Sequence, residues 1–210
     1  MNARTIDPRD LIVQEHAPTI MVPSHSPLAP LDPYGHRYLA ARDGLWIDIH
    51  RPLGRIRAPL AASPLPLPYG SPEPVFEFAF GRIGEHMGLL KQFIAEARAA
   101  LPNEFAAWLV WDSYDKVMLY RPCRTIDASA DRIHFERPNL DRNECLAIDL
   151  HSHGAAPAFF SSTDNADDAG EVKIAGVVGS LDQPAPSLCF RVCAMGVFVD
   201  VQVPAEALKP

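Results

Sequence analysis

Two histidines, a serine and an aspartate lie close together in the segment DLHSHGAAPAFFSSTD, residues 149–164. His151 and His153 are two residues apart at the end of a predicted strand. Their imidazoles therefore project to the same side, with Cα atoms about 6–7 Å apart. Two imidazoles that converge on one point are typical of a zinc or iron site. After a seven-residue loop come Ser161 and then Asp164, at the predicted start of a helix.

Asp164 can return to the two histidines as a third, anionic ligand. Such a set leaves a fourth position open to water, which is typical of a catalytic rather than a structural zinc. Hydrolysis also needs a group that takes a proton from water and gives one to the leaving group, and one carboxylate outside the ligand set can do both. The best candidate is Glu104 in LPNEFAAWLV, because a glutamate beside so apolar a strand has no packing reason to be there. The sequence therefore predicts one zinc ion per chain, with Glu104 as general acid–base.

The elements that must position these residues follow the order helix, strands, helix, strands. Apolar residues step by four and three between Ile83 and Leu101, which predicts an amphipathic helix that ends at Pro102. A short helix is predicted at the Asp-rich stretch 162–171. Strands are predicted at 105–112, 116–122, 132–136, 144–153, 173–181, 187–195 and 196–203. This order predicts an α/β core with helices packed on a mixed sheet.

Proline sets the beginning of the chain apart, since 13 of the 21 prolines lie in the first 74 residues. The string SPLPLPYGSPEP (63–74) predicts an extended connector. We therefore expect a Pro-rich N-terminal appendage over residues 1–75 and a core over residues 76–210. An Asp-Gly pair between two apolar runs predicts a β-hairpin near residues 37–50. The Pro-rich part is interpreted as a linker, with a ligand for aromatic grooves as the alternative.

Charge and composition exclude several classes of protein. A net charge of −7 over 210 residues argues against a nucleic-acid binder, which would need a basic face. No stretch of about 18 apolar residues lacks both charge and proline, so no membrane span is expected. The start, MNARTIDPRD, places Asp7 and Asp10 where a signal peptide would need apolar residues. We expect a soluble, cytoplasmic protein, whose oligomeric state the sequence leaves open.

The complete pattern is His-x-His, seven residues, Ser, two residues and Asp, with an upstream Pro-x-Glu that opens an apolar strand. This pattern resembles the JAMM motif of MPN-type (JAB) metallopeptidases. The resemblance implies that His151, His153 and Asp164 bind zinc. It further implies that Glu104 is the general acid–base and that Ser161 helps to stabilise the tetrahedral oxyanion.

The resemblance covers roughly residues 76–203 and implies an MPN-like mixed β-sheet core flanked by helices. It also implies hydrolysis of an amide or isopeptide bond at the C-terminal tail of a ubiquitin-like or small carrier protein. The appendage and the run HSHG…PAFFSSTD…DD further resemble the protein A family of plasmid-borne PRTRC systems, whose companions are similar to activating and conjugating enzymes. The chain departs from the JAMM family's pattern at Ala106-Ala107, where a Cys-Gly pair is common. The alternative function is a non-catalytic MPN scaffold within a plasmid-encoded multiprotein system.

Several residues of the histidine segment also have structural explanations. Ser161 or its neighbour can cap the following helix. Asp149 is interpreted as a solvated aspartate at the strand edge, with orientation of a ligand histidine as the alternative. Asp168 is expected to interact with the helix dipole. Phe159 and Phe160 either shape a substrate groove or anchor their loop.

Overall fold

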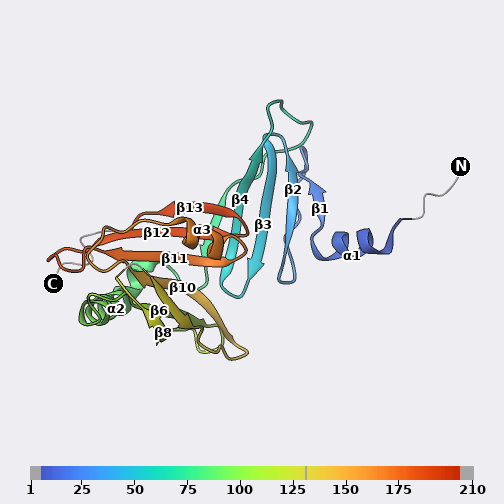
Figure 1. The fold of residues 1–210 in the computed structure, drawn as a ribbon. Coiled ribbons are helices and arrows are strands. Elements are labelled where there is room, and N and C mark those ends of the chain that lie inside the picture. The colour runs from blue at the N-terminus through green and yellow to red at the C-terminus, as the bar shows by residue number, and fades with distance from the viewer. Residues whose placement is uncertain (1–5, 131, 204–210) are drawn as a thin grey trace, which may run out of the picture. The chain divides into compact units, whose positions relative to one another are not determined.

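The computed structural model describes residues 6–130 and 132–203, and the chain divides into two compact units, Met1–Phe78 and Ala79–Pro210 (Figure 1). The mixed α/β architecture expected from the sequence is confirmed. In the described part of the chain, no helix is long and apolar enough to cross a membrane.

The N-terminal unit contains a helix and a five-stranded sheet whose strands follow chain order. Its elements are α1 (Pro8–His16), β1 (Thr19–Met21), β2 (Gly35–Ala41), β3 (Gly44–Arg51), β4 (Gly54–Ala62) and β5 (Val75–Phe78). β1 pairs with β2 in parallel, and the other pairs are antiparallel. The predicted hairpin is confirmed, with Arg42 and Asp43 as the turn between β2 and β3. Gly44 begins β3 at a φ of 140°, a conformation that favours glycine.

The Pro-rich string at 63–74 forms neither helix nor strand, as predicted, but it does not connect two domains. It joins β4 to β5, and these two strands pair with each other in one sheet. Phe76, which we expected to begin the core, therefore lies in a strand of the N-terminal sheet, opposite Ile56. β5 has only four residues, VFEF, and so short an alternation of apolar and polar residues does not distinguish a strand from the extended segment before it.

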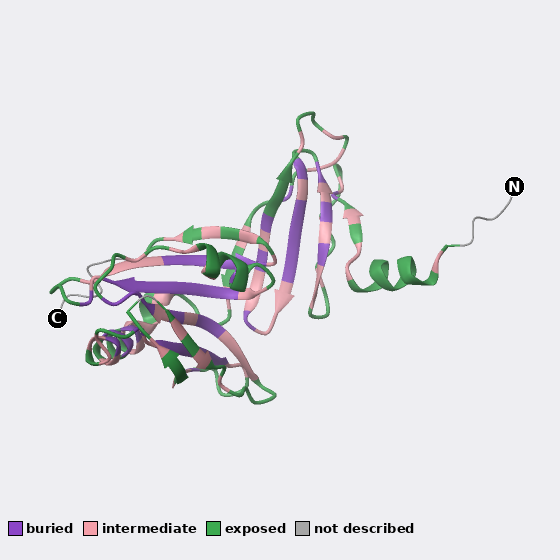
Figure 2. Ribbon diagram, viewed as in Figure 1, coloured by how far each residue is buried: buried purple, intermediate pink, exposed green. Residues whose placement is uncertain are grey.

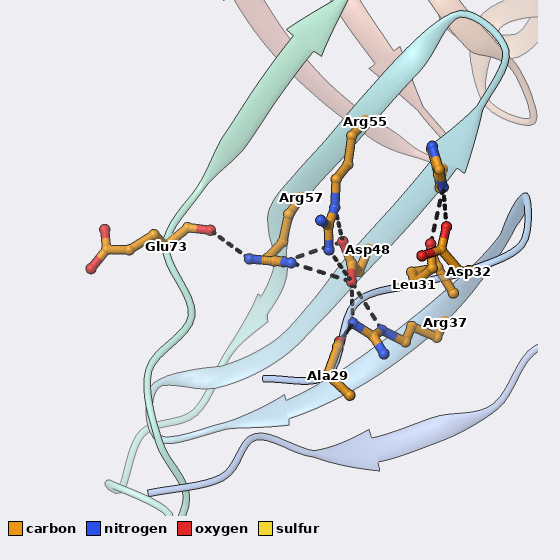
Figure 3. Close-up of polar contacts among 9 residues, drawn as sticks. Ala29, Leu31, Asp32, Arg37, Asp48, Arg55, Arg57 and Glu73 are labelled. Atoms are coloured by element: carbon orange, nitrogen blue, oxygen red, sulfur yellow. Dashed lines mark hydrogen bonds and ion pairs between the residues drawn. The ribbon is translucent and has the colours of Figure 1, made fainter. Parts of the chain in front are cut away.

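A buried carboxylate joins three strands of the N-terminal sheet (Figure 3). Asp48 on β3 is fully buried and accepts a hydrogen bond of 2.9 Å from Arg37 on β2. Arg55 and Arg57 on β4 donate to the same carboxylate at 3.5 and 3.2 Å. Burial alone would raise the pKa of Asp48, but hydrogen bonds and charge from the arginines lower it below its ordinary value. Asp48 is therefore ionised at neutral pH and offsets part of the arginine charge.

The C-terminal unit is built on a six-stranded sheet of order β13-β12-β11-β10-β6-β7, with β8 and β9 as a separate two-stranded sheet. Its elements are η1 (Ile83–His86), α2 (Met87–Ala99), β6 (Ala106–Asp112), β7 (Val117–Pro122), β8 (Arg124–Ala128), β9 (Ile133–Glu136), β10 (Glu144–Ser152), α3 (Ser162–Asp168), β11 (Val172–Gly179), β12 (Ser187–Ala194) and β13 (Val197–Val201). β10 and β11 are parallel, and the other pairs of the large sheet are antiparallel. A parallel pair needs a crossover connection, which α3 and its flanking loops provide.

Helix α2 covers one face of the large sheet. It confirms the predicted amphipathic helix, although its first turn, η1, is a 3₁₀ helix. Its buried side chains are Leu90, Phe93, Ile94 and Ala97. Glu96 on α2 accepts a hydrogen bond of 2.7 Å from the hydroxyl of Tyr120 on β7, which opposes Leu109 on β6. α2 therefore packs on the face to which Leu109 points.

The opposite face contains the candidate site. Trp108 on β6 opposes Asp149 on β10, so these two side chains share that face. Ile133 and Phe135 of β9 pack against the cluster that contains Trp108. α3 lies beside β11 and β12 (Figure 1) and is bound to them through Asp168. The β8–β9 sheet and α3 therefore lie on the same face of the large sheet, opposite α2.

Burial differs between the elements. Figure 2 shows that the central strands are largely buried, whereas α1 has no buried residue.

Replacing Asp48 with Asn should destabilise the N-terminal sheet by about 3 kcal/mol, because three arginines would lose their buried counter-ion. The pKa of Asp48 is lower in the folded protein than in the unfolded chain. Asp48 therefore stabilises the folded state fully at any pH above its unfolded pKa, and this contribution is lost as the pH falls through its folded pKa. Amide hydrogen exchange in β2–β4 at pH 7 measures the loss of stability, because the amides of a destabilised sheet exchange faster. The exposed Asp10→Asn variant is the control, and equal protection in both variants would contradict the prediction.

Candidate metal centre

Three predicted ligands converge at the end of β10. The Nε2 atoms of His151 and His153 are 3.2 Å apart, and Nε2 of His151 is 3.3 Å from Oδ1 of Asp164. One donor atom from each of the three residues lies within 4.8 Å of the others. His151 is in β10, His153 follows its last residue, and Asp164 is in the first turn of α3. Side chains alternate between the two faces of a strand, so His151 and His153 point the same way, and the first turn of α3 brings Asp164 to them. The three side chains therefore meet, as the spacing predicted.

The donor set fits a zinc ion. Zinc bonds of about 2.0–2.1 Å in tetrahedral geometry place neighbouring ligand atoms about 3.3 Å apart. The two distances at His151 are close to this value. Two imidazole nitrogens and one carboxylate oxygen are also ligands that zinc prefers, and they leave one position for water or substrate.

Backbone contacts hold the end of β10 on both sides. Ser152, between the two histidines, is fully buried; its N–H donates to the carbonyl of Phe105 at 2.9 Å and its hydroxyl accepts from the Phe105 N–H at 2.9 Å. On the other side, the N–H of His153 donates to the carbonyl of Val178 on β11 at 2.9 Å. Because Glu104 precedes Phe105, the Ser152 contacts also fix the backbone of Glu104 relative to the histidines.

Two glycines shape the loop between the second histidine and Ser161. Gly154, immediately after His153, has a φ of 55°, which turns the chain away from the strand direction. Gly179 at the end of β11 lies directly under the loop, and a Cβ there would be 2.3 Å from the carbonyl oxygen of Ala156. The loop can therefore lie close against the sheet only because position 179 has no side chain.

The two phenylalanines of this loop have different environments. Phe159 is 52% exposed, contacts His153 edge-to-face with ring centroids 4.6 Å apart, and lines the cavity described below. Phe160 instead packs under the guanidinium of Arg191, at 3.8 Å from ring centroid to Cζ. Phe160 therefore anchors the loop, whereas Phe159 is exposed beside the predicted metal ligands.

Ser161 is the N-cap of α3, so the capping alternative is observed. Its hydroxyl accepts from the N–H of Asp164 at 3.2 Å and donates to Oδ2 of Asp164 at 2.7 Å. The N–H of Ser161 also donates to this oxygen at 2.7 Å. These contacts hold one carboxylate oxygen of Asp164 and turn the other toward His151. The contribution of Ser161 to an oxyanion site stays a prediction.

The ionisation of His153 suits metal binding. Burial and the neighbouring His151 lower its pKa, and together they outweigh the charge of Asp164 and a backbone hydrogen bond to Pro157. A lowered pKa keeps the imidazole neutral at pH 7, which is the form that binds a metal ion.

A cavity of about 670 Å³ opens beside the ligands, between β9, α3 and the loop after His153. It is lined by all five predicted site residues: Glu104, His151, His153, Ser161 and Asp164. Glu104 is 7% exposed, and its N–H donates to the carbonyl of Ser129 at 2.8 Å. The structure thus brings the predicted ligands and the predicted acid–base to one cavity, while the roles of Glu104 and Ser161 stay predictions.

Two expectations about acidic residues were wrong. Asp149 is not a freely solvated charge: its side chain is only 19% exposed and accepts a hydrogen bond of 2.6 Å from the ammonium of Lys173 on β11. Asp168 is buried and pairs with Lys173 at 2.8 Å and with Arg191 on β12 at 2.6 Å. Sequence reasoning missed Lys173 and Arg191, although a cation inside each of two apolar strands is a signal that a buried anion lies nearby.

The fold and the site together define a class: an α/β domain in which two histidines and one carboxylate that could hold a metal ion converge at the end of a central strand. A family model described as prokaryotic homologues of the JAB domain matches residues 86–193, just over half of the chain. The chain therefore belongs to the prokaryotic JAB-domain family, which confirms the resemblance to MPN-type proteins. Residues 7–79 match a domain of unknown function, DUF2016.

Other comparisons add little to the family assignment. No curated protein matches the chain significantly. Among solved structures, protein DSY2949 from Desulfitobacterium hafniense is similar, with 19% sequence identity and a TM-score of 0.42. The similarity covers 55% of this chain and 86% of that protein.

The double variant His151→Ala/His153→Ala should lose the metal that the wild type retains. We expect about one zinc per wild-type chain, since three donors converge on one point, and almost none in the variant. Mass spectrometry of protein purified without added metal measures the content. The matched control is His16→Ala/His25→Ala, which removes two exposed histidines and should keep the zinc. Equal zinc in both double variants would contradict the assigned ligands.

Proposed function

We propose that the protein is a zinc-dependent hydrolase of amide or isopeptide bonds, of the JAMM metallopeptidase type. One observation supports this most directly: Glu104, which is not in the ligand set, lines the same cavity as His151, His153 and Asp164. A metal site with an open position and an adjacent carboxylate contains the groups that hydrolysis of an amide needs. Membership of the JAB-domain family agrees with this chemistry.

Each residue has a defined part in the proposed reaction. His151, His153 and Asp164 would hold zinc, and zinc when bound supplies Lewis acidity that polarises the scissile carbonyl and activates water. Glu104 takes a proton from the attacking water, whose oxygen bonds to the carbonyl carbon. The same carboxyl then gives the proton to the amine as the C–N bond breaks. The Ser161 hydroxyl donates to Asp164 in this structure, and we propose that it turns into the cavity to stabilise the oxyanion when substrate binds.

For the substrate, we propose the C-terminal tail of a ubiquitin-like or small carrier protein. The cavity has apolar walls from Ile133, Phe135 and Phe159, which can accept an extended apolar tail. By resemblance to the PRTRC protein A family, companions similar to activating and conjugating enzymes would attach the modifier that this protein removes. Neither nucleic acid nor a membrane is part of the proposal.

The second candidate is a non-catalytic MPN scaffold within a multiprotein system. The family includes such modules, and the N-terminal unit offers an additional surface for a partner. The convergence of three metal donors favours the hydrolase, because a scaffold has no need of an assembled ligand set with an open position.

Replacing Glu104 with Gln should lower turnover by about a hundredfold to ten-thousandfold while leaving zinc bound, because the amide cannot take the proton. Turnover is measured by release of aminomethylcoumarin from peptide amides that end in Gly-Gly. The exposed Glu15→Gln variant is the control and should keep full activity.

Two outcomes would contradict the proposal in different ways. Full activity of the Glu104→Gln variant would show that another group moves the proton. A wild type that holds zinc but cleaves none of the amides, including the same tails on intact carrier proteins, would favour the scaffold.

A further inference from the structure

Four charged side chains, those of Asp149, Asp168, Lys173 and Arg191, form a largely buried ionic group at the wall of the cavity. The ammonium of Lys173 is 2.6 Å from Asp149 and 2.8 Å from Asp168, and the guanidinium of Arg191 is 2.6 Å from the other oxygen of Asp168. The side chain of Lys173 is only 4% exposed, and those of Asp168 and Arg191 are similarly buried. Two cations and two anions balance, so the group as a whole is neutral.

The ionic group lies alongside the ligand set and joins the same two elements. Asp149 and His151 are two residues apart on β10, so they point to one face of the sheet. Asp164 and Asp168 are four residues apart on α3, so they lie one turn apart on one side of the helix. Lys173 bridges Asp149 to Asp168, just as a metal ion would bridge His151 to Asp164.

Helix α3 depends on this ionic contact for its position. It has only seven residues, too few to be stable without tertiary contacts. Asp168 is its one buried residue. Because α3 has no apolar stripe to pack on the sheet, the pairs made by Asp168 are its main buried attachment.

Arg191 and Lys173 hold Asp168 from different directions. Arg191 contacts Asp168 and Asn165 of α3, and its guanidinium lies between the rings of Phe160 and Phe198. It therefore joins α3 to β12, β13 and the loop before the helix. Lys173 links α3 to Asp149 and so to β10, the strand that contains His151, in addition to the direct contact between Asp164 and His151.

Lys173 is charged at neutral pH. Burial alone would lower its pKa, but the charges and hydrogen bonds of Asp149 and Asp168 raise it to about 12. Its ammonium is therefore a cation between the two carboxylates at neutral pH.

We propose that Lys173 is a positioning residue for the metal centre: its ammonium binds Asp149 and Asp168 together and thereby holds Asp164 within coordinating distance of His151. This inference rests on the proposed zinc site. It predicts that a group outside the ligand set, and on a different strand, controls the affinity for zinc.

Two variants separate this positioning effect from simple loss of a buried charge. Lys173→Met keeps much of the side-chain volume but leaves the carboxylates of Asp149 and Asp168 with one cation. Asp149→Asn/Lys173→Met restores the charge balance and keeps the Asp168–Arg191 pair, but it still lacks the ionic link that Lys173 makes between α3 and β10. The matched control is Lys116→Met, the same substitution at an exposed lysine.

The measurements are zinc affinity by competition with a chromophoric chelator, melting temperature, and amide exchange of residues 162–168 in metal-free protein. We expect Lys173→Met to weaken zinc binding about tenfold to hundredfold, as loss of a residue that orients a ligand does. In the double variant the melting temperature should recover toward that of the wild type. Its zinc affinity should remain weakened and its α3 amides should exchange faster than in the wild type.

Wild-type zinc affinity and wild-type exchange of α3 in the double variant would overturn the inference, since charge balance alone would then explain Lys173. A wild type that binds no zinc would overturn the proposed metal site instead. In that case unchanged α3 exchange in the double variant would still overturn the role of Lys173 in holding the helix, whereas faster exchange would support it.

Discussion

The candidate site depends on the attachment of one short helix to one strand. Asp164 can meet the two histidines only if the first turn of α3 lies beside the end of β10, yet α3 buries a single side chain, that of Asp168. Ion pairs among buried side chains therefore attach α3 to the sheet, whereas apolar packing attaches α2. Such pairs are directional and sensitive to distance, so they specify where the helix lies more narrowly than an apolar contact would.

A second constraint brings Glu104 to the histidines from far away in the sequence. The antiparallel pairing of β6 and β10 sets Ala106 opposite His151, and Ser152 extends the contact to Phe105 through two hydrogen bonds. Glu104 is thus attached to the same sheet edge as the ligands. His151, His153 and Glu104 therefore lie at the ends of two central strands, whereas Ser161 and Asp164 lie at the start of α3.

The N-terminal unit also contains a buried carboxylate that is paired with several cations, but there the pairs join strands to one another. Asp48, like Asp168, is a buried carboxylate shared by cations from neighbouring strands, but it joins β2, β3 and β4 rather than positioning a ligand (Figure 3). Its sheet is complete in itself, from β1 to β5.

The sequence by itself determined that His151, His153 and Asp164 come together, and it determined most elements of the C-terminal unit. His-x-His at a strand end and Ser-x-x-Asp at a helix start are local patterns, because the geometry of one strand and one helical turn places those side chains. Local patterns could not predict β5, the environment of Asp149 or the pairing of Asp168. Those features depend on strands brought together from distant parts of the chain, and only the tertiary structure decides which buried cation meets which buried anion.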